Sequence, residues 1–247
     1  MKSVASLLLV GAVVCLASCS KKEETVQQDP ASFRVKTIQH SKSGLTDTYI
    51  YTGDNKIQAI NYSDGSKVSY EYADSTLIEQ TFDAAGSLQS TRTMKLDEQG
   101  RVAESAVTNS EGRVTAYDVV TYDGAGHKNS ATHYKANHDI NGKEEWSWGD
   151  DIYNYAIYDS AGINKDCDYY FWYYDPTVTT ITNENKGMAF MGKGEHFLTR
   201  YFHRYSGKFG EQVEKYDYTL DAKKRVNVVR THDHFGVITN TDIYTYY

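Results

Sequence analysis

The chain has 247 residues, and its 26 Lys and Arg against 33 Asp and Glu give a formal net charge of −7 at pH 7. This balance excludes nucleic acid as a partner, because such binding needs Lys and Arg clustered on one face. Twenty-two Tyr and only two Pro residues indicate strands rather than helices, since aromatic side chains fit a pleated, half-buried surface.

Residues 1–18 have the layout of a secretory signal peptide. Lys2 precedes an apolar run from Leu7 to Val14, which ends in the small residues Ala17 and Ser18. The run is too short for a permanent membrane span, which needs roughly 20 apolar residues. We therefore expect this segment to be removed and not to form part of the fold.

The sequence Leu16-Ala17-Ser18-Cys19 resembles the lipobox of bacterial lipoproteins. In that class the cysteine thiol receives a diacylglyceryl group and a peptidase cuts before it, so the resemblance implies that Cys19 is the lipid-bearing first residue. Two or three acyl chains, palmitate among them, hold a protein at a membrane through about 0.8 kcal/mol per buried methylene. We expect an outer-membrane lipoprotein on the periplasmic or the surface side, with an ordinary secretory signal as the alternative.

Residues 19–32 lack apolar periodicity and include the charged run Lys21–Glu24, which is typical of a flexible tether. A single domain is expected over residues 33–247, because about 215 residues is a length that all-β proteins fill as one domain. Cys167 stands beside the aromatic run Tyr169–Tyr174 and is interpreted as a small buried hydrophobe.

A short unit recurs along this domain, in which Asp follows an apolar or aromatic residue and Gly comes three residues later. The best copies are Phe82–Leu88 and Leu96–Val102. Asp accepts hydrogen bonds from the following backbone N–H groups, and Gly supplies the positive φ that closes a short hairpin. Weaker copies, two of them with Lys or Asn in the Gly place, are Tyr51–Ile57, Tyr122–His127, Tyr158–Ile163 and Leu220–Val226.

Three tighter signals, Asp64-Gly65, Glu111-Gly112 and Asn141-Gly142, are typical of two-residue hairpins. Between turns the side chains alternate, so that Val68, Tyr70 and Tyr72 share one face. Turns recur roughly every 10 to 14 residues. This spacing predicts an all-β fold in the form of an antiparallel meander of β-hairpin repeats. We expect a curled sheet or barrel-like shape, with a two-layer β-sandwich as the alternative.

These units resemble the tyrosine-aspartate (YD) repeats of wall-associated and Rhs-type β-proteins. Over residues 45–247 the arrangement is similar to a family of uncharacterised outer-membrane lipoproteins from gut-dwelling Gram-negative bacteria. Lys128 and Asn164 depart from the pattern, because the best copies have an apolar residue there. The resemblance implies the hairpin fold and the membrane anchor, and it carries over no catalytic residues.

Trp146 and Trp148 would share one face of a strand, with acidic pairs on either side, and Trp172 lies in the later aromatic run. Aromatic faces flanked by carboxylates can stack on sugar rings, so these three residues are candidate ligand-binding aromatics. The alternative is that the rings fill the core or cover a sheet edge, and burial statistics favour it.

His232 and His234 could suggest a metal site, but Gly236 indicates a turn and no third ligand has a recognisable spacing. We therefore expect no bound metal. The same interpretation, solvated loop residues, applies to His133, His138, His196 and His203.

No Gly-x-Ser-x-Gly elbow and no phosphate-binding Gly-rich loop in a strand-to-helix context occurs. We expect a non-enzymatic binding or scaffold module without a cofactor, whose partners are the membrane, through the lipid on Cys19, and a glycan or another envelope protein. Two alternatives stay open. One is a glycan-binding accessory of a polysaccharide uptake system, and the other is a hydrolase with an unidentified carboxylate site.

Overall fold

The computed structural model describes sixteen strands and one short 3-10 turn within residues 34–148, 152–163, 169–179, 186–191, 197–206, 210–223 and 225–247. The predicted signal peptide, the predicted lipidation site Cys19, the predicted tether and Cys167 lie outside the described residues. In the described segments no helix is long and apolar enough to cross a membrane.

The strands follow one another along the chain with the short turn η3 between β12 and β13. Their bounds are β1 Val35–His40, β2 Thr46–Tyr51, β3 Ile57–Tyr62, β4 Lys67–Ala73, β5 Thr76–Phe82, β6 Leu88–Leu96, β7 Val102–Asn109, β8 Val114–Tyr122, β9 Lys128–Lys135, β10 Ile140–Trp148, β11 Ile152–Asp159, β12 Tyr169–Thr179, η3 Ala189–Met191, β13 Phe197–Ser206, β14 Gly210–Leu220, β15 Val226–His232 and β16 Ile238–Tyr246.

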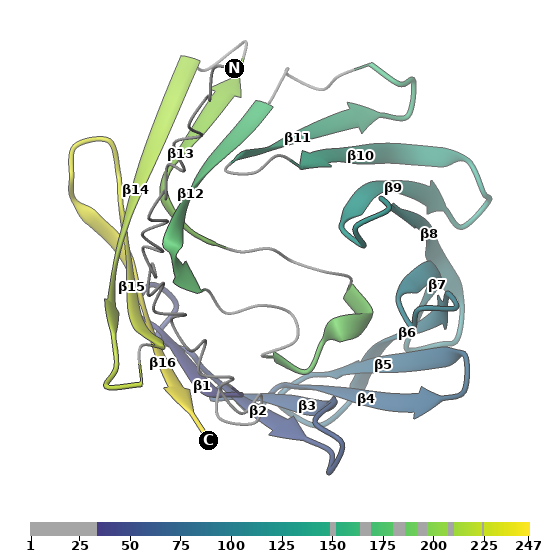
Figure 1. Ribbon diagram of the computed structural model, residues 1–247. Helices are drawn as coiled ribbons and strands as arrows, with labels where there is room; N and C mark the ends of the chain where they lie inside the picture. Colours follow the sequence, from purple (N-terminus) through teal and green to yellow (C-terminus); the bar gives the residue numbers. More distant parts are fainter. Residues whose placement is uncertain are drawn as a thin grey trace, which may run out of the picture.

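These strands form one closed antiparallel barrel, in which each strand pairs with its neighbours in sequence and β1 pairs with β16 (Figure 1). At the seam Ile38 lies opposite Tyr244, and His40 lies opposite Asp242. The antiparallel meander and its barrel-like curl are therefore confirmed. The two-layer sandwich is not formed, because the last strand closes the sheet onto the first.

The turn at Asp97 shows why the repeat unit bends the chain. The Asp97 carboxylate accepts hydrogen bonds from the backbone N–H groups of Gln99 and Arg101, both at 2.9 Å. Gly100 has a φ of 76°, a conformation that residues with a Cβ avoid. The predicted roles of Asp and Gly are thus confirmed. Equivalent hydrogen bonds, donated by backbone N–H groups to the carboxylate, occur at Asp83, Asp123, Asp159, Asp221 and Asp233.

The turns at Asp64-Gly65 and Glu111-Gly112 have the same backbone hydrogen-bond pattern as the turn at Asp97. The expectation of two-residue hairpins is therefore wrong for both. The N–H of Gly65 donates to the carbonyl of Tyr62, and the N–H of Tyr62 donates to the carbonyl of Ser66, each at 3.0 Å. The loop between Tyr62 and Ser66 is thus one residue longer than a two-residue hairpin. In this longer loop Gly65 adopts positive φ as part of a bulge next to the strand.

The third expected hairpin, at Asn141-Gly142, is also wrong, because both residues lie inside β10. The chain turns earlier, where His138 takes a φ of 66°. Gly142 instead occupies an irregularity in the register of β9 and β10. A Cβ there would lie 2.9 Å from the carbonyl oxygen of Tyr158, which explains the glycine.

One end of the barrel interior is apolar. Val35, Ile57 and Leu77 are fully buried, and Val102 and Val226 are nearly so. All five lie at or next to the first residue of an odd-numbered strand. Because odd-numbered strands of an antiparallel meander run in the same direction, these side chains lie at the end where β1 begins, and all but Val226 belong to one buried cluster. We call these five residues the apolar floor.

Residues 186–191, which include η3, lie inside the barrel above this floor (Figure 1). Phe190 is 5% exposed and packs against two tyrosine rings of β4, at centroid distances of 5.9 and 6.4 Å. The carbonyl of Gly187 accepts a hydrogen bond from the N–H of Ile57 at 3.0 Å. A Cβ on Gly187 would lie 2.6 Å from that nitrogen, so only glycine lets the segment dock there.

A contact that we call the staple ties the turn at Asp97 to a strand further along the chain. The guanidinium of Arg101 donates to the Asp97 carboxylate at 2.8 and 2.7 Å and lies 4.2 Å from the ring centroid of Tyr122. The Tyr122 hydroxyl donates to the carbonyl of Val102 at 2.9 Å. Ion pair, cation–π contact and hydrogen bond thus fix β6, β7 and β8 together at the apolar end.

The staple recurs with the same spacing elsewhere at this end of the barrel. Arg225 pairs with Asp221 and lies 4.3 Å from the ring of Tyr246, and in a variant form His127 stacks on Trp148. In all three cases the aromatic residue contacts a backbone carbonyl 20 positions earlier. At these three turns the repeat unit is therefore a structural device that joins the turn to the strand after the next.

Replacing Arg101 by Met should lower the free energy of unfolding by about 1 to 3 kcal/mol, because it removes a charge-assisted pair and a cation–π contact at a site where both side chains are 20% exposed. Urea denaturation measures this loss. Arg113→Met is the matched control, since Arg113 follows Gly112 in an equivalent turn but its side chain is 75% exposed. Equal effects of the two substitutions would contradict the stabilising role of the staple.

Candidate functional site

Polar side chains gather on the inner wall of the barrel around Asp118. The register of β6 to β9 places Met94, Ser105, Asp118 and His133 on one face, and Met94, which is 2% exposed, shows that this face is the interior. The Ser105 hydroxyl donates to Asp118 at 2.9 Å, and Nδ1 of His133 lies 2.7 Å from the same carboxylate. With Glu144 of β10 these polar residues form what we call the inner cluster.

His133 is held between two carboxylates, since its Nδ1 faces Asp118 and its Nε2 lies 3.6 Å from Glu144. The hydrogen bond to Asp118, followed by the interaction with Glu144, raises the pKa of His133 to about 9. The ring is therefore an imidazolium at neutral pH, and both of its N–H groups are engaged. A ring in this state has no free lone pair and serves neither as a general base nor as a metal ligand.

The expectation that His133 is a solvated loop residue is wrong, because it lies within β9 and faces the interior. His138 does lie in a turn, where its ring stacks on Tyr117, and His232 ends β15 with Nε2 2.8 Å from Asp217. His196 and the side chain of His203 are outside the described residues. Within the described segments no group of three or more His, Cys, Asp or Glu side chains could hold a metal ion.

Asp118 anchors the inner cluster as a carboxylate. Its burial alone would raise the pKa, but the hydrogen bonds from His133 and Ser105 outweigh burial and lower it. The Ser105 hydroxyl donates to Asp118 and not to His133, so these three residues lack the contact between nucleophile and base that activates a serine. The arrangement fixes charge at one place on the wall.

A cavity of about 170 Å³ borders the inner cluster. Arg92 and Lys128 contribute its cationic wall. Lys128 is half-buried, and this burial lowers its pKa although the charges of Glu144 and Asp118 act in the opposite direction. The apolar part of the wall consists of Met94, Val102, Val120, Ala131 and Met191.

Trp146 and Trp148 do share one face of β10, as the sequence predicts, and this face is the interior face that carries Glu144. The Trp146 ring stacks on Tyr155 at 5.2 Å and has the Lys128 ammonium 4.1 Å from its centroid. The Trp148 Nε1–H donates to the Lys128 carbonyl at 2.7 Å. Both rings therefore line the wall beside the cavity.

Trp172 lies in β12, and its side chain is outside the described residues. The structure thus brings Trp146 and Trp148 together near the inner cluster and leaves the third candidate aromatic residue as a prediction.

A second polar group lies across the seam of the barrel. His40 Nδ1 is 2.8 Å from Asp242, and its Nε2 is 3.2 Å from Asp47. Burial opposes the charge on this ring, but the two carboxylates outweigh it and raise the pKa of His40. Lys186, from the segment inside the barrel, is half-buried, and burial lowers its pKa although the charges of Asp47 and Asp242 act in the opposite direction. The contacts of His40 join β1, β2 and β16.

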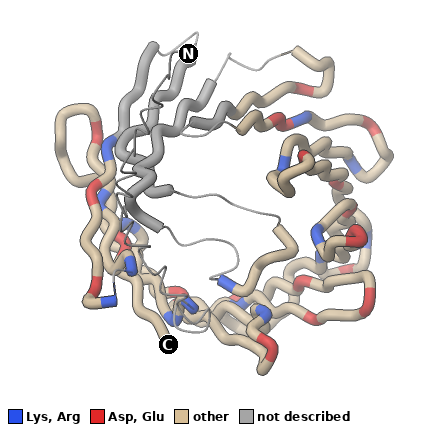
Figure 2. Tube along the Cα trace, in the orientation of Figure 1, with Lys and Arg blue, Asp and Glu red and all other residues tan. Residues whose placement is uncertain are grey.

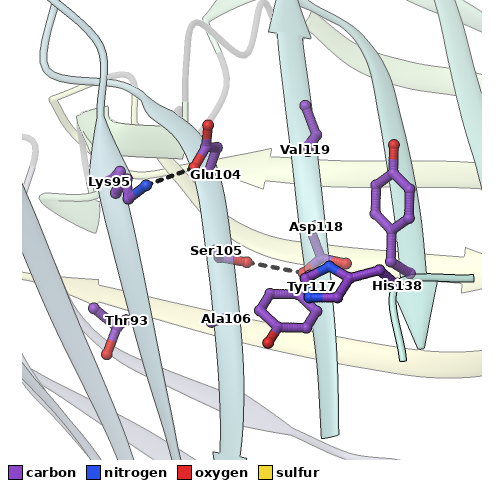
Figure 3. A pocket seen from close by; sticks show the side chains of 10 residues that line it. Thr93, Lys95, Glu104, Ser105, Ala106, Tyr117, Asp118, Val119 and His138 are labelled. Carbon is purple, nitrogen blue, oxygen red and sulfur yellow. Dashed lines mark hydrogen bonds and ion pairs between the residues drawn. The ribbon is translucent and has the colours of Figure 1, made fainter. Parts of the chain in front are cut away.

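A groove of about 450 Å³ lies on the opposite, outer face of β6 to β9 (Figure 3). Tyr117 and His138 stack across it with ring centroids 4.3 Å apart, and Lys95 pairs with Glu104 at 2.9 Å along its edge. Figure 3 shows the bond between Ser105 and Asp118 behind this surface. The groove and the inner cluster are therefore two sides of the same strands.

The residues of this candidate site that sequence reasoning missed are Arg92, Asp118 and Lys128, whereas Glu144 was noted as part of the acidic pair before Trp146. One signal could have marked Asp118, because the alternating positions of its strand are otherwise apolar or aromatic: Val114, Ala116, Val120 and Tyr122. The departure of Lys128 from the repeat pattern was a second signal. Neither signal could tell which residues of other strands would face them.

No protein-family model matches the chain, and no curated protein sequence matches it. A solved structure of a porin-like protein from Bacteroides uniformis is similar, with 13% identity, a TM-score of 0.64 and coverage of 88% of this chain and 99% of that one. A porin-like protein from Bacteroides vulgatus matches with 10% identity and a TM-score of 0.58, covering 87% and 99%. The chain shares the fold of these two proteins.

A TcdB2-TccC3-Cdc42 structure aligns with 12% identity over 68% of this chain and 10% of that chain. Its TM-score of 0.26 carries no argument about the fold.

Replacing His133 by Gln should remove part of the pH dependence of stability. The pKa of about 9 lies above the ordinary value of 6.5, so the stabilisation from His133 is complete below about pH 6.5 and is lost as the pH rises through 9. Between about pH 6 and pH 9 the wild type should lose on the order of 1 to 2 kcal/mol more than His133→Gln, a figure reduced for solvent screening.

Urea denaturation at both pH values measures this difference. His138→Gln is the control, because His138 lies in an exposed turn on the outer surface. The opposite shifts of the Asp118 and Glu144 pKa values act only at acidic pH, where their stabilisation is lost as these carboxylates become protonated. If His133→Gln and the wild type lose the same stability, the imidazolium is not held as described.

Proposed function

We propose that the protein is a lipid-anchored lipoprotein of the outer membrane that acts as a non-enzymatic binding module, and that its ligand binds inside the barrel. The observation that carries this proposal is the inner cluster. Charged side chains on the interior wall, next to a cavity, are costly unless they are paired, and a binding function gives a reason for placing them there.

The polar outer wall supports a barrel that stands beside the membrane and is held by its lipid. Membrane-spanning barrels present a continuous apolar band to lipid. Here, by contrast, the outward positions of β6, β9 and β10 include Thr91, Thr93, Lys95, Ser130, Thr132, Lys143, Glu145 and Ser147. Figure 2 shows positive and negative residues mixed around the described wall.

The porin-like neighbours support an envelope location for this chain, but the apolar floor favours a cup over an open pore. The floor and Phe190 fill one end of the described interior, and the inner cluster lies further along the same wall. The state of the inner cluster supports binding rather than hydrolysis, because His133 is fully engaged and Ser105 has no base.

A glycan is one ligand class that the interior could accept, since Trp146 and Trp148 lie beside the cavity. Their faces are partly covered by Lys128, Tyr155 and His127. A sugar would therefore meet ring edges and polar groups and not an open aromatic platform.

The anchor is tested by labelling cells with an alkyne analogue of palmitate. The wild type should take up the label and partition into the detergent phase of Triton X-114, and Cys19→Ser should do neither, because it lacks the thiol that accepts the lipid. Cys15→Ser is the matched control and should behave as the wild type does. An unlabelled wild type, or a labelled Cys19→Ser variant, would contradict the anchor.

Interior binding is tested by thermal shift of the barrel with a panel of neutral sugars and small organic acids. Ala131 is 1% exposed and lines the cavity, so Ala131→Leu should fill part of it and abolish any shift that the wild type shows. Ala106→Leu, on the outer face, is the control. A panel without any effect on the wild type, or shifts that persist in Ala131→Leu, would contradict interior binding.

A further inference from the structure

We propose that the interior cavity binds the acidic group of a small molecule, a carboxylate or a phosphate, between Arg92 and Lys128. This inference rests on the proposed binding function and names the class of ligand for that site. Three lines of observation lead to it: the balance of charge around the cavity, the unused donors of the two cations, and the size and lining of the space.

The charges that face the cavity do not cancel. Three basic side chains, His133, Arg92 and Lys128, line the cavity, whereas Asp118 is the one acidic residue in its described lining and Glu144 faces it from the far side of His133. Both anions are already engaged by His133, at 2.7 and 3.6 Å. An excess of positive charge in a partly enclosed space attracts an anionic ligand, because the low dielectric strengthens the interaction.

Among the described residues, the two cations also keep donors free for a ligand. The Arg92 guanidinium lies 4.0 Å from Asp118, a distance at which it forms no hydrogen bond. Within the described part of the chain, the Lys128 ammonium lies over the Trp146 ring and has no carboxylate in an ion pair. An acidic group that binds a cation in this position forms charge-assisted hydrogen bonds, which are stronger than hydrogen bonds between neutral groups.

The volume of the cavity limits how large the ligand can be apart from its acidic group. Its volume of about 170 Å³ is similar to the roughly 150 Å³ of an engineered protein cavity that holds benzene. Val120, Ala131 and Met191 form an apolar wall opposite the cations. The site therefore fits an acid with a body of about one six-membered ring, and both a sugar acid and an aromatic acid meet this description.

Calorimetric titration of the whole folded domain separates these sources. The probes are D-glucuronate, benzoate and inorganic phosphate, with D-glucose as the neutral partner of glucuronate. We expect at least one of the three anions to bind, and glucose to bind at least about tenfold more weakly than glucuronate. The anion that binds most tightly shows whether the ligand is a sugar acid, an aromatic acid or a phosphate.

The decisive variant is Lys128→Met, which keeps the apolar stem and removes the charge. It should weaken binding of the anion by at least about tenfold. Lys95→Met is the matched control, because Lys95 lies on the outer face and its side chain is 70% exposed. Circular dichroism checks each variant for folding. If Lys128→Met does not fold, Arg92→Gln takes its place, since the Arg92 side chain is 44% exposed and tolerates change.

The inference is overturned if no anion binds the wild type, if the anion binds Lys128→Met or Arg92→Gln as tightly as the wild type, or if glucose binds as well as glucuronate. A neutral sugar that binds inside the barrel while the anions fail would overturn the charge-based inference alone. The proposed binding function would then still stand, so the two failures are distinguishable.

Discussion

Pairing of the last strand with the first is the constraint on which the whole structure depends. Because β16 adds to β1 and extends the meander into a ring, the sheet has no free edge, and one face of every strand becomes an interior wall. Once closed, the barrel must fill or use that interior. The alternation of side chains then assigns each residue to the inner or the outer wall, as it does for Met94 and Lys95.

The interior is filled unevenly along the barrel axis. At the end where β1 begins, the apolar floor, Phe190 and the staples supply burial, cation–π contacts and hydrogen bonds that hold the turns to the strands. At the other end of the barrel, Arg113 occupies the turn position that corresponds to Arg101. Its side chain is largely exposed and has no aromatic partner in the described structure. The stabilising contacts are therefore concentrated at the end of the barrel where β1 begins. The wall further along the axis carries the charged side chains of the inner cluster.

Charged groups on an interior wall stay charged only when their neighbours compensate for lost hydration. His133 meets this condition through two carboxylates, and His40 meets it through Asp47 and Asp242. Lys128 meets it less completely, because an aromatic ring takes the place of a carboxylate. This difference in compensation separates the side chains that hold the wall together from those on which the proposed ligand site depends.

The sequence by itself determined the strands, their alternation and most turns, because an Asp that caps its own loop and a Gly with positive φ act over a few residues. Asn141-Gly142 shows the limit, since a turn signal was overridden by the register of β9 and β10. Only the tertiary structure decided that the sheet closes and that Asp118, His133 and Glu144 meet. Residues on three strands become neighbours through register and curvature, which are properties of the whole sheet and not of any local segment.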